Sequence, residues 1–300
     1  MALGSALIAN LGALWRQRGA VAAPDVKVKR PVRTVVGLFR SKWWTIGYVA
    51  AFFAWLLHVG ALAIAPLSIV QAALATGFIF LGLLADRFFG LDLGAREWTG
   101  MALASAGLAF LALTAGGVHG QQSGYELASM IGFEAAMVAL GAVLLVTAHR
   151  GEVARHRSGV LLGAGAGALF TATHVGIKAV THHFDGALSL ASPWTPIVVA
   201  GAVAAFFASA RSLQIGAAVP VIAVTSISGN ATSIAAGVVV FGDPLGTGAM
   251  VVARIAVFAI VVVVAALLGG EMHEAAEASG SSLRGEGSLR RGGGPARAHA

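Results

Sequence analysis

The chain has 300 residues, of which 57% are hydrophobic and 11% are charged, compared with about 25% charged residues in typical soluble domains. This composition excludes a water-soluble enzyme and a disordered chain, and the absence of cysteine excludes disulfides and thiolate metal sites. The net charge of +7 would suit a nucleic-acid binder, but the positions of the basic residues favour membrane orientation, so we expect no nucleic-acid partner.

Apolar segments recur along the chain between short breaks that contain charged residues, glycine or proline. The candidate membrane spans cover residues 2–15, 43–64, 67–85, 98–115, 128–148, 159–180, 194–210, 215–240 and 247–268. Most are long enough for a helix to cross a hydrocarbon core of about 30 Å. Their apolar residues do not alternate with polar ones, which favours helices over a barrel. The first segment would form about 21 Å of helix and is expected to be a short or tilted span.

Basic residues concentrate in alternate breaks between these spans. Residues 16–42 carry eight Lys and Arg residues against Asp25 alone, and the positive-inside rule places such a loop in the cytoplasm. When the spans are threaded from that loop, 18 of the 20 basic residues fall on the cytoplasmic side. The opposite side receives the breaks at 116–127, 181–193 and 242–246, which contain no Lys or Arg. The sequence therefore predicts about nine transmembrane helices in the plasma membrane, with the N-terminus outside and the C-terminus in the cytoplasm.

Two regions of the chain echo each other. Residues 61–71 and 212–222 each carry a proline at the start of an apolar span, and the two spans end at Asp86 and Asp243. By the threading, Asp86 lies inside and Asp243 outside, so the copies run through the bilayer in opposite directions, as in inverted-repeat transporters. We expect a first transmembrane repeat at 1–116, a second at 117–269 and a disordered cytoplasmic tail at 270–300.

Four short motifs carry a family resemblance. They are Pro66-Leu67-Ser68-Ile69-Val70-Gln71, Glu97-Trp98-Thr99-Gly100, Ala217-Ala218-Val219-Pro220-Val221-Ile222 and Phe241-Gly242-Asp243-Pro244-Leu245-Gly246. With them the chain resembles the drug/metabolite transporter superfamily, the EamA-like proteins, over most of residues 1–268. The resemblance implies two bundled repeats around a central cavity with alternating access. That family has five helices per repeat, whereas residues 17–42 are too charged to cross here, and nine spans is similar to the related NIPA-type magnesium transporters.

Polar side chains within the spans are the candidates for a solute site. A charge at the bilayer centre costs at least about 2.5–3.5 kcal/mol, so it needs a partner or a cavity. The candidate residues are His58, Gln71, Glu134, Thr171, His174, Lys178, Asn230 and Arg254. Glu134 and Lys178 are expected at similar depths on neighbouring helices, which predicts an ion pair or a shared hydrogen-bond network. Glu134 and His174 are the candidates for carrying a coupling proton.

Two helix faces extend this set. Thr171, His174 and Lys178 follow at spacings of three and four, so they share a face that either lines a cavity or makes a structural polar contact. The face continues through Gly167 and Gly163, which predict close helix packing. Span 215–240 carries six polar side chains around one glycine, which predicts a half-unwound or cavity-facing segment.

These features favour a secondary transporter that lies in the lipid bilayer, binds a small solute in a cavity between its helices and moves it by alternating access. The chain has no phosphate-binding loop and no acid–base or metal set with recognisable spacing, and His182, His183 and Asp185 fit a solvated loop. We therefore expect no enzyme, cofactor or metal site. The spans offer a single carboxylate against two cations, which favours a metabolite over Mg²⁺. A NIPA-type transporter of Mg²⁺ or another cation, a non-transporting membrane scaffold and a homodimer stay open.

Overall fold

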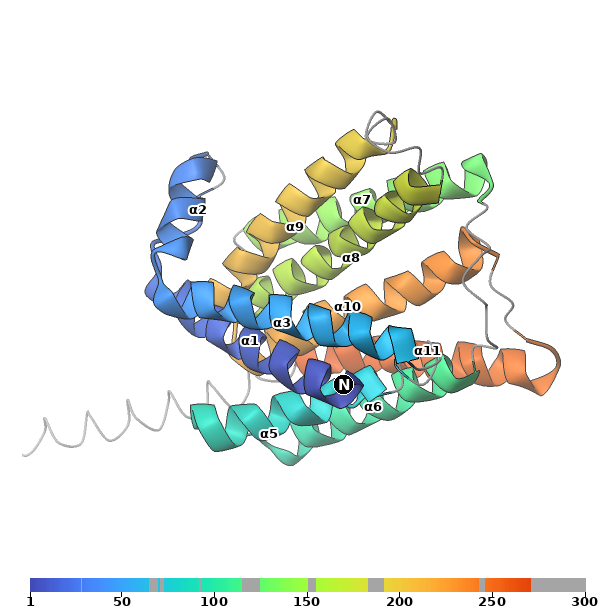
Figure 1. Ribbon diagram of the computed structural model, residues 1–300, viewed down its shortest axis with the longest axis horizontal. Helices are drawn as coiled ribbons and strands as arrows, with labels where there is room; N and C mark the ends of the chain where they lie inside the picture. Colours follow the sequence, from blue (N-terminus) through green and yellow to red (C-terminus); the bar gives the residue numbers. More distant parts are fainter. Residues whose placement is uncertain are drawn as a thin grey trace, which may run out of the picture. The chain divides into compact units, whose positions relative to one another are not determined.

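All regular secondary structure in the described part of the chain is helical. The computed structural model describes residues 1–27, 29–64, 70, 73–91, 93–114, 125–150, 155–182, 192–242 and 246–270. The helices are α1 (Ala2–Ala22), α2 (Pro31–Phe39), α3 (Lys42–Ile64), α5 (Gly77–Phe89), α6 (Ala95–Thr114), α7 (Leu127–His149), α8 (Arg155–His182), α9 (Thr195–Ile215), α10 (Ala218–Val239) and α11 (Ala249–Gly270) (Figure 1). These residues contain no strand, which confirms the all-helical expectation.

Five helical segments are long and apolar enough to cross a membrane. Among the described residues they are Leu127–His149, Arg157–Ile177, Thr195–Ile215, Ala218–Val239 and Ala249–Leu268. They lie in α7 to α11 and overlap the last five predicted spans. The chain is therefore a multi-pass helical membrane protein. The complete set of nine spans, the division into two inverted repeats and the orientation of the termini stay predictions.

The first helix is longer than the sequence predicts. α1 continues past Arg16 and Arg18 to Ala22, so the helix has 21 residues and extends about 31 Å, and the predicted end of this segment at residue 15 is wrong. Arginine is a good helix former, and both guanidinium groups make cation–π contacts with rings of α3. Arg16 lies over Tyr48 at 5.3 Å and Arg18 over Trp43 at 4.6 Å, measured to the ring centroids.

Helix α2 lies within the predicted cytoplasmic loop 16–42. Its nine residues extend about 13 Å, which is far short of the hydrocarbon thickness, in agreement with the prediction that this segment does not cross. Thr34 fixes α2 to the preceding linker, because its hydroxyl donates to the carbonyl of Lys27 at 3.1 Å and accepts from the Lys27 amide at 3.2 Å.

The loops that the threading assigns to one side of the membrane meet at one end of the helices. Arg211, near the end of α9, donates to Asp25 in the linker after α1 at 2.9 Å, and a Cβ on Gly159 at the start of α8 would touch Gly216. At the other end of α9, Trp194 donates to the Tyr125 hydroxyl at 3.2 Å. These contacts join segments that the threading assigns to the same side, and the orientation of the helices stays a prediction.

Helix α8 occupies the centre of one group of helices. It contacts α7, α9 and α10, while α1 packs against α3 (Figure 1). Helices α8 and α10 run parallel, because Gly163 lies against Val221 and Thr225, and Gly167, one turn later, lies against Thr225 and Gly229. A Cβ on Gly167 would lie 2.6 Å from the Thr225 carbonyl oxygen, so this contact requires glycine. The predicted close packing through these glycines is confirmed.

Candidate functional site

A polar cavity of about 330 Å³ lies between α1, α8, α9 and α10. Its lining residues are Ala13, Arg16, Gly167, Phe170, Thr171, His174, Ser209, Leu213, Ile222, Thr225, Ser226, Gly229, Asn230 and Ser233. On α10 the lining runs from Ile222 to Ser233, about 17 Å, so the cavity extends from near the helix ends at the predicted cytoplasmic side to beyond the middle of α10.

Helix α10 presents the largest set of polar groups to this cavity. Ser226, Asn230 and Ser233 are exposed to it, whereas the hydroxyl of Thr225 donates to its own helix at the Val221 carbonyl. The helix is continuous from Ala218 to Val239, so the half-unwound alternative is wrong and the cavity-facing alternative describes the segment. Hydroxyls that bond carbonyls of their own helix satisfy their polarity without unwinding it.

Thr171 joins α8 to α10 at the wall of the cavity. Its side chain is 1% exposed; the hydroxyl donates to the Gly229 carbonyl at 3.0 Å and lies 2.7 Å from the Thr232 hydroxyl and 3.2 Å from that of Ser233. His174, one turn further along α8, is exposed and also lines the cavity. Thr171 and His174 thus share the cavity-facing side of α8, and Thr171 in addition makes the structural contact.

Arg16 enters the cavity from α1, and the sequence analysis missed it. The sequence places Arg16 at the start of the basic loop, whereas the longer α1 carries it on a helix against α3. Its Nε is buried and has no hydrogen-bond partner among the described residues. Residues 19–22, which follow the arginines, are uncharged and contain no proline, so the sequence allows the helix to continue there.

The described lining residues include no carboxylate. Arg16 is the fixed cation of the cavity, and His174 is its other titratable side chain. No group of three or more His, Asp or Glu residues in the described part of the chain is placed to hold a metal ion. Electrostatically, the cavity as described suits a solute with an anionic or polar group better than a bare cation.

The other predicted site residues lie elsewhere. Glu134 is on α7, 3% exposed; its oxygens have no hydrogen-bond partner among the described residues, and a Cβ on Gly176 of α8 would lie 3.8 Å from Oε1. His58 is on α3, with Nδ1 buried and without a partner in the described residues. Arg254, on α11, donates to the Thr114 hydroxyl at 3.3 Å.

Two candidates fall where the structure gives no description. Gln71 lies outside the described residues, and so do the side chain of Lys178 and the residues His183 and Asp185. The predicted contact between Glu134 and Lys178 is therefore untested. Of the eight candidates, Thr171, His174 and Asn230 are brought together at the cavity, and His58, Glu134 and Arg254 are not.

An apolar cluster follows the cavity along α8 and α10. It contains Met130, Phe133, Val175, Ala179, Trp194, Ala236, Val240 and Phe241, all buried. Val175 and Ala179 come after His174 on α8, and Ala236 and Val240 come after Ser233 on the parallel α10. The cluster therefore lies beyond the cavity, at the end of the helices where Tyr125 contacts Trp194.

The described part of the chain is thus a multi-pass helical membrane protein with a polar cavity between α1, α8, α9 and α10. The chain is 21% identical over 251 residues to the probable magnesium transporter NIPA9 of Arabidopsis thaliana, covering 79% of this chain and 71% of that protein. No family model matches the chain, and no solved structure matches it. The similarity supports a membrane transporter and favours a non-enzymatic function.

Proposed function

We propose that the protein is a secondary transporter that binds a small anionic or zwitterionic metabolite in the cavity between α1, α8, α9 and α10. The observation that carries this proposal is the composition of the lining, in which Arg16 and several hydroxyl and amide groups occur together with no carboxylate among the described residues. A guanidinium binds carboxylate or phosphate oxygens through two parallel hydrogen bonds, and hydroxyls and an amide can bind the polar remainder of such a solute.

The arrangement of the cavity and the apolar cluster supports alternating access as the mechanism. The cavity extends from the predicted cytoplasmic side to beyond the middle of α10, and the buried cluster around Met130 and Phe133 lies beyond its other end. In this proposal the structure corresponds to a state that faces the cytoplasm. Separation of α7 from α8 and α10 at the cluster would then open the opposite side, and the small residues at the α8–α10 contact would keep that pair together.

Transport of Mg²⁺ is the second candidate, and the similarity to the probable magnesium transporter NIPA9 favours it. Mg²⁺ usually keeps several waters and binds through one or two carboxylates. Glu134 is a buried carboxylate in α7, but it does not line the cavity. We rank the metabolite above Mg²⁺ because the charge of the cavity opposes a divalent cation.

Flux in proteoliposomes separates these candidates. The purified protein is reconstituted, and uptake of a panel of radiolabelled organic anions is compared with Mg²⁺ uptake reported by a trapped fluorescent indicator. Arg16→Gln is expected to lower anion uptake at least about tenfold, because a hydrogen bond to a charged group contributes about 1.5–3 kcal/mol. Arg18→Gln is the matched control, since exposed Arg18 lies two residues further along α1 and outside the cavity. Mg²⁺ uptake that is unaffected by Arg16→Gln, with no anion uptake, would reject the metabolite proposal.

A further inference from the structure

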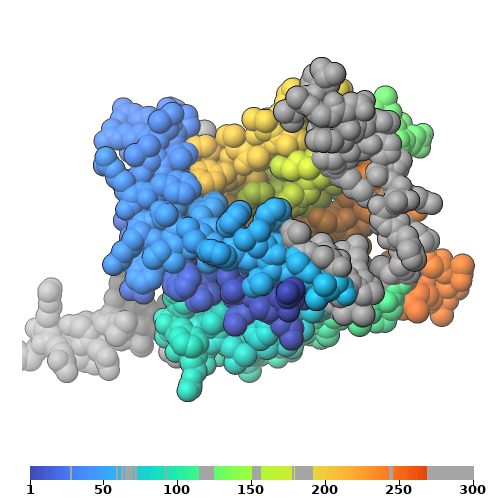
Figure 2. All heavy atoms as spheres, in the orientation of Figure 1, coloured from blue at the N-terminus to red at the C-terminus, as the bar shows by residue number. Residues whose placement is uncertain are grey.

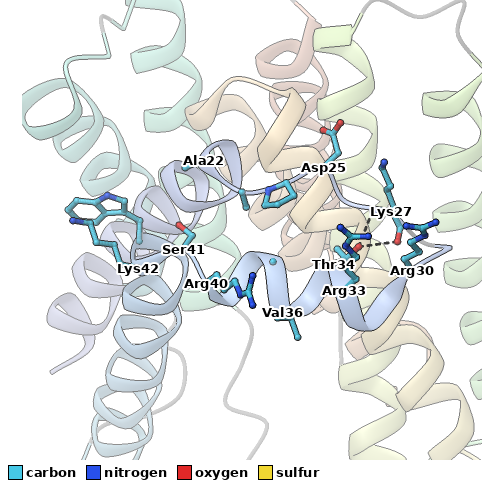
Figure 3. A pocket seen from close by; sticks show the side chains of 14 residues that line it. Ala22, Asp25, Lys27, Arg30, Arg33, Thr34, Val36, Arg40, Ser41 and Lys42 are labelled. Carbon is cyan, nitrogen blue, oxygen red and sulfur yellow. Dashed lines mark hydrogen bonds between the residues drawn. The ribbon is translucent and has the colours of Figure 1, made fainter.

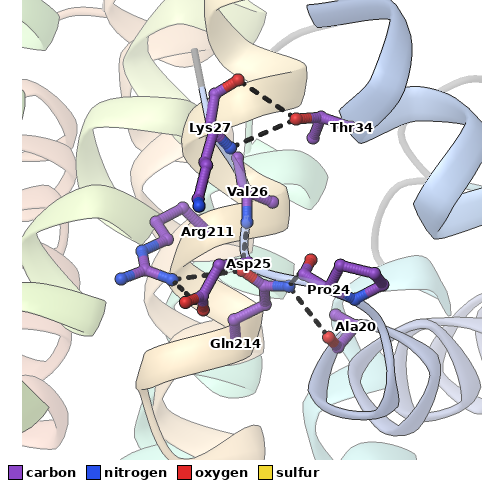
Figure 4. Close-up of polar contacts among 8 residues, drawn as sticks. All are labelled: Ala20, Pro24, Asp25, Val26, Lys27, Thr34, Arg211 and Gln214. Atoms are coloured by element: carbon purple, nitrogen blue, oxygen red, sulfur yellow. Dashed lines mark hydrogen bonds and ion pairs between the residues drawn. The ribbon is translucent and has the colours of Figure 1, made fainter. Parts of the chain in front are cut away.

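A second and larger hollow, of about 880 Å³, lies between the end of α1, the linker that follows it and α2 (Figure 3). Five basic side chains line it: Lys27, Arg30, Arg33, Arg40 and Lys42. Asp25 is the one acidic residue among its described lining, and it is paired with Arg211 at 2.9 Å (Figure 4). Asp25 therefore does not neutralise the five basic side chains that line the hollow.

An apolar stripe on α2 lies next to this hollow. Val32, Val36 and Phe39 are 75%, 48% and 43% exposed, and their spacing of four and three places them on one face of the helix. Thr34 and Leu38, which are buried, occupy the opposite face and hold α2 against the rest of the protein. In Figure 2 the atoms of this segment, in blue at the upper left, lie at the surface.

The place of α2 in the chain puts this stripe at the level of a membrane surface. The helix connects α1 and α3, which pack against each other, and residues 16–42 carry the strongest positive charge of any predicted loop. A short helix with one apolar face and flanking basic residues is typical of a segment that lies in the interface between headgroups and acyl chains. Basic residues next to a membrane are attracted to the anionic lipids of the cytoplasmic leaflet.

We propose that the hollow and α2 together form a docking site for an anionic phospholipid of the cytoplasmic leaflet. The phosphate of the headgroup binds among Arg30, Arg33 and Arg40, and Val32, Val36 and Phe39 insert toward its acyl chains. A lipid is favoured over free phosphate because the apolar stripe has no counterpart in a soluble anion. This site is separate from the transport cavity and does not depend on the proposed transport function.

Lipid selectivity tests the charge part of the proposal. Native mass spectrometry of the purified protein counts bound phosphatidylglycerol against bound phosphatidylcholine. Arg33→Gln/Arg40→Gln is expected to reduce the preference for phosphatidylglycerol about 25-fold, because each of the two basic residues near an anionic surface contributes roughly fivefold. Arg87→Gln/Arg150→Gln is the matched control, since it removes the same charge from exposed residues outside the hollow, and it is expected to leave the preference within about twofold. Equal losses in the two double variants would overturn the proposal, and so would displacement of the lipid by inorganic phosphate alone.

A depth measurement tests the apolar part. The chain contains no cysteine, so Val36→Cys can be spin-labelled at a single position. In bilayers that contain phosphatidylglycerol we expect the label to be accessible to oxygen and shielded from a water-soluble nickel chelate. In pure phosphatidylcholine we expect it to become accessible to the chelate. A label that is accessible to the chelate in both bilayers contradicts insertion of α2. A label that is equally shielded from the chelate in both bilayers contradicts the role of charge. A label that is shielded from both the chelate and oxygen indicates a protein partner and contradicts the lipid site.

Discussion

Arg211 donates a hydrogen bond to Asp25 across 2.9 Å, although the two residues are 186 positions apart in the chain (Figure 4). The contact joins the end of α9 to the linker after α1. Both segments belong to loops that the distribution of Lys and Arg assigns to the cytoplasm. The contact therefore links two loops on which the predicted orientation depends, and it explains how the linker before α2 is held.

Gln214 is expected to hold this linker more firmly than the ion pair does. Its amide nitrogen donates to the carbonyls of Ala20 and Pro24, and its Oε1 accepts from the amide of Val26, each at 3.0 Å. We expect Gln214→Ala to lower the free energy of unfolding by about 1–3 kcal/mol, since it leaves backbone groups without partners. Asp25→Asn is the comparison and should cost less than about 1 kcal/mol, because Asp25 is 70% exposed. Thermal unfolding in detergent measures both, and a larger loss for Asp25→Asn would contradict this account.

Close packing of α8 on α10 predicts a strong effect at Gly167. A Cβ there would meet the carbonyl of Thr225 and the amide of Gly229, so Gly167→Ala should destabilise the protein by about 1–3 kcal/mol. Gly132 on α7 is the matched control, because a Cβ at that position would have no neighbour within 4 Å among the described atoms. Gly132→Ala should be neutral or slightly stabilising, since alanine favours helix. Equal melting temperatures for the two variants would refute the packing.

Thr171 should contribute to stability through its contacts with α10. Thr171→Val keeps the shape of the side chain and removes the hydrogen bonds to Gly229, Thr232 and Ser233, at an expected cost of about 0.6–2 kcal/mol. Thr173→Val is a suitable control, because the Thr173 hydroxyl donates to the Leu169 carbonyl of its own helix. We expect Thr173→Val to change the free energy of unfolding by less than about 0.5 kcal/mol. A cost for Thr173→Val that matches that for Thr171→Val would show that the interhelical contact is unimportant.

The apolar cluster beyond the cavity should act as a barrier. Met130 is fully buried in it, and Met130→Ala is expected to leave a space that water can reach, at a cost of about 2–5 kcal/mol. We expect this variant to let a membrane-impermeant thiol reagent reach Ser226→Cys from the side opposite the basic loops. Leu127→Ala, on the same helix but 59% exposed, should not. Labelling at the same rate in the two backgrounds would show that the cluster does not close the path.

Much of the fold could be predicted from composition, because long apolar runs between charged breaks leave few alternatives to membrane helices. The error at α1 has a local cause. Charge counting treats Arg16 and Arg18 as the end of a span, whereas the rings of Tyr48 and Trp43 accept both guanidinium groups and the helix continues to Ala22.

The candidate site was predicted in part for a related reason. Helical spacing placed Thr171 and His174 on one face and identified the polar segment of α10. Spacing within one helix says nothing about which other helix faces it, so the contribution of Arg16 from α1 could not be predicted. Glu134 is an error of the opposite kind. A carboxylate within a span is easily noticed in the sequence, but Glu134 packs between α7 and α8 and does not line the cavity.

Protection of Ser226→Cys by solute tests most directly whether the cavity is the transport site. Ser226 is exposed to the cavity, and the unmodified chain has no cysteine to compete for the reagent. We expect the reagent to react from the cytoplasmic face of oriented vesicles, and an anionic solute that the reconstituted protein carries to slow this reaction at least about tenfold when it is saturating. Ala95→Cys is the control, because Ala95 is exposed at the start of α6, in a loop that the threading also assigns to the cytoplasm, and lies outside the cavity; it should show no protection. An alkylation rate at position 226 that the carried solute leaves unchanged would contradict the assignment of this cavity as the transport site.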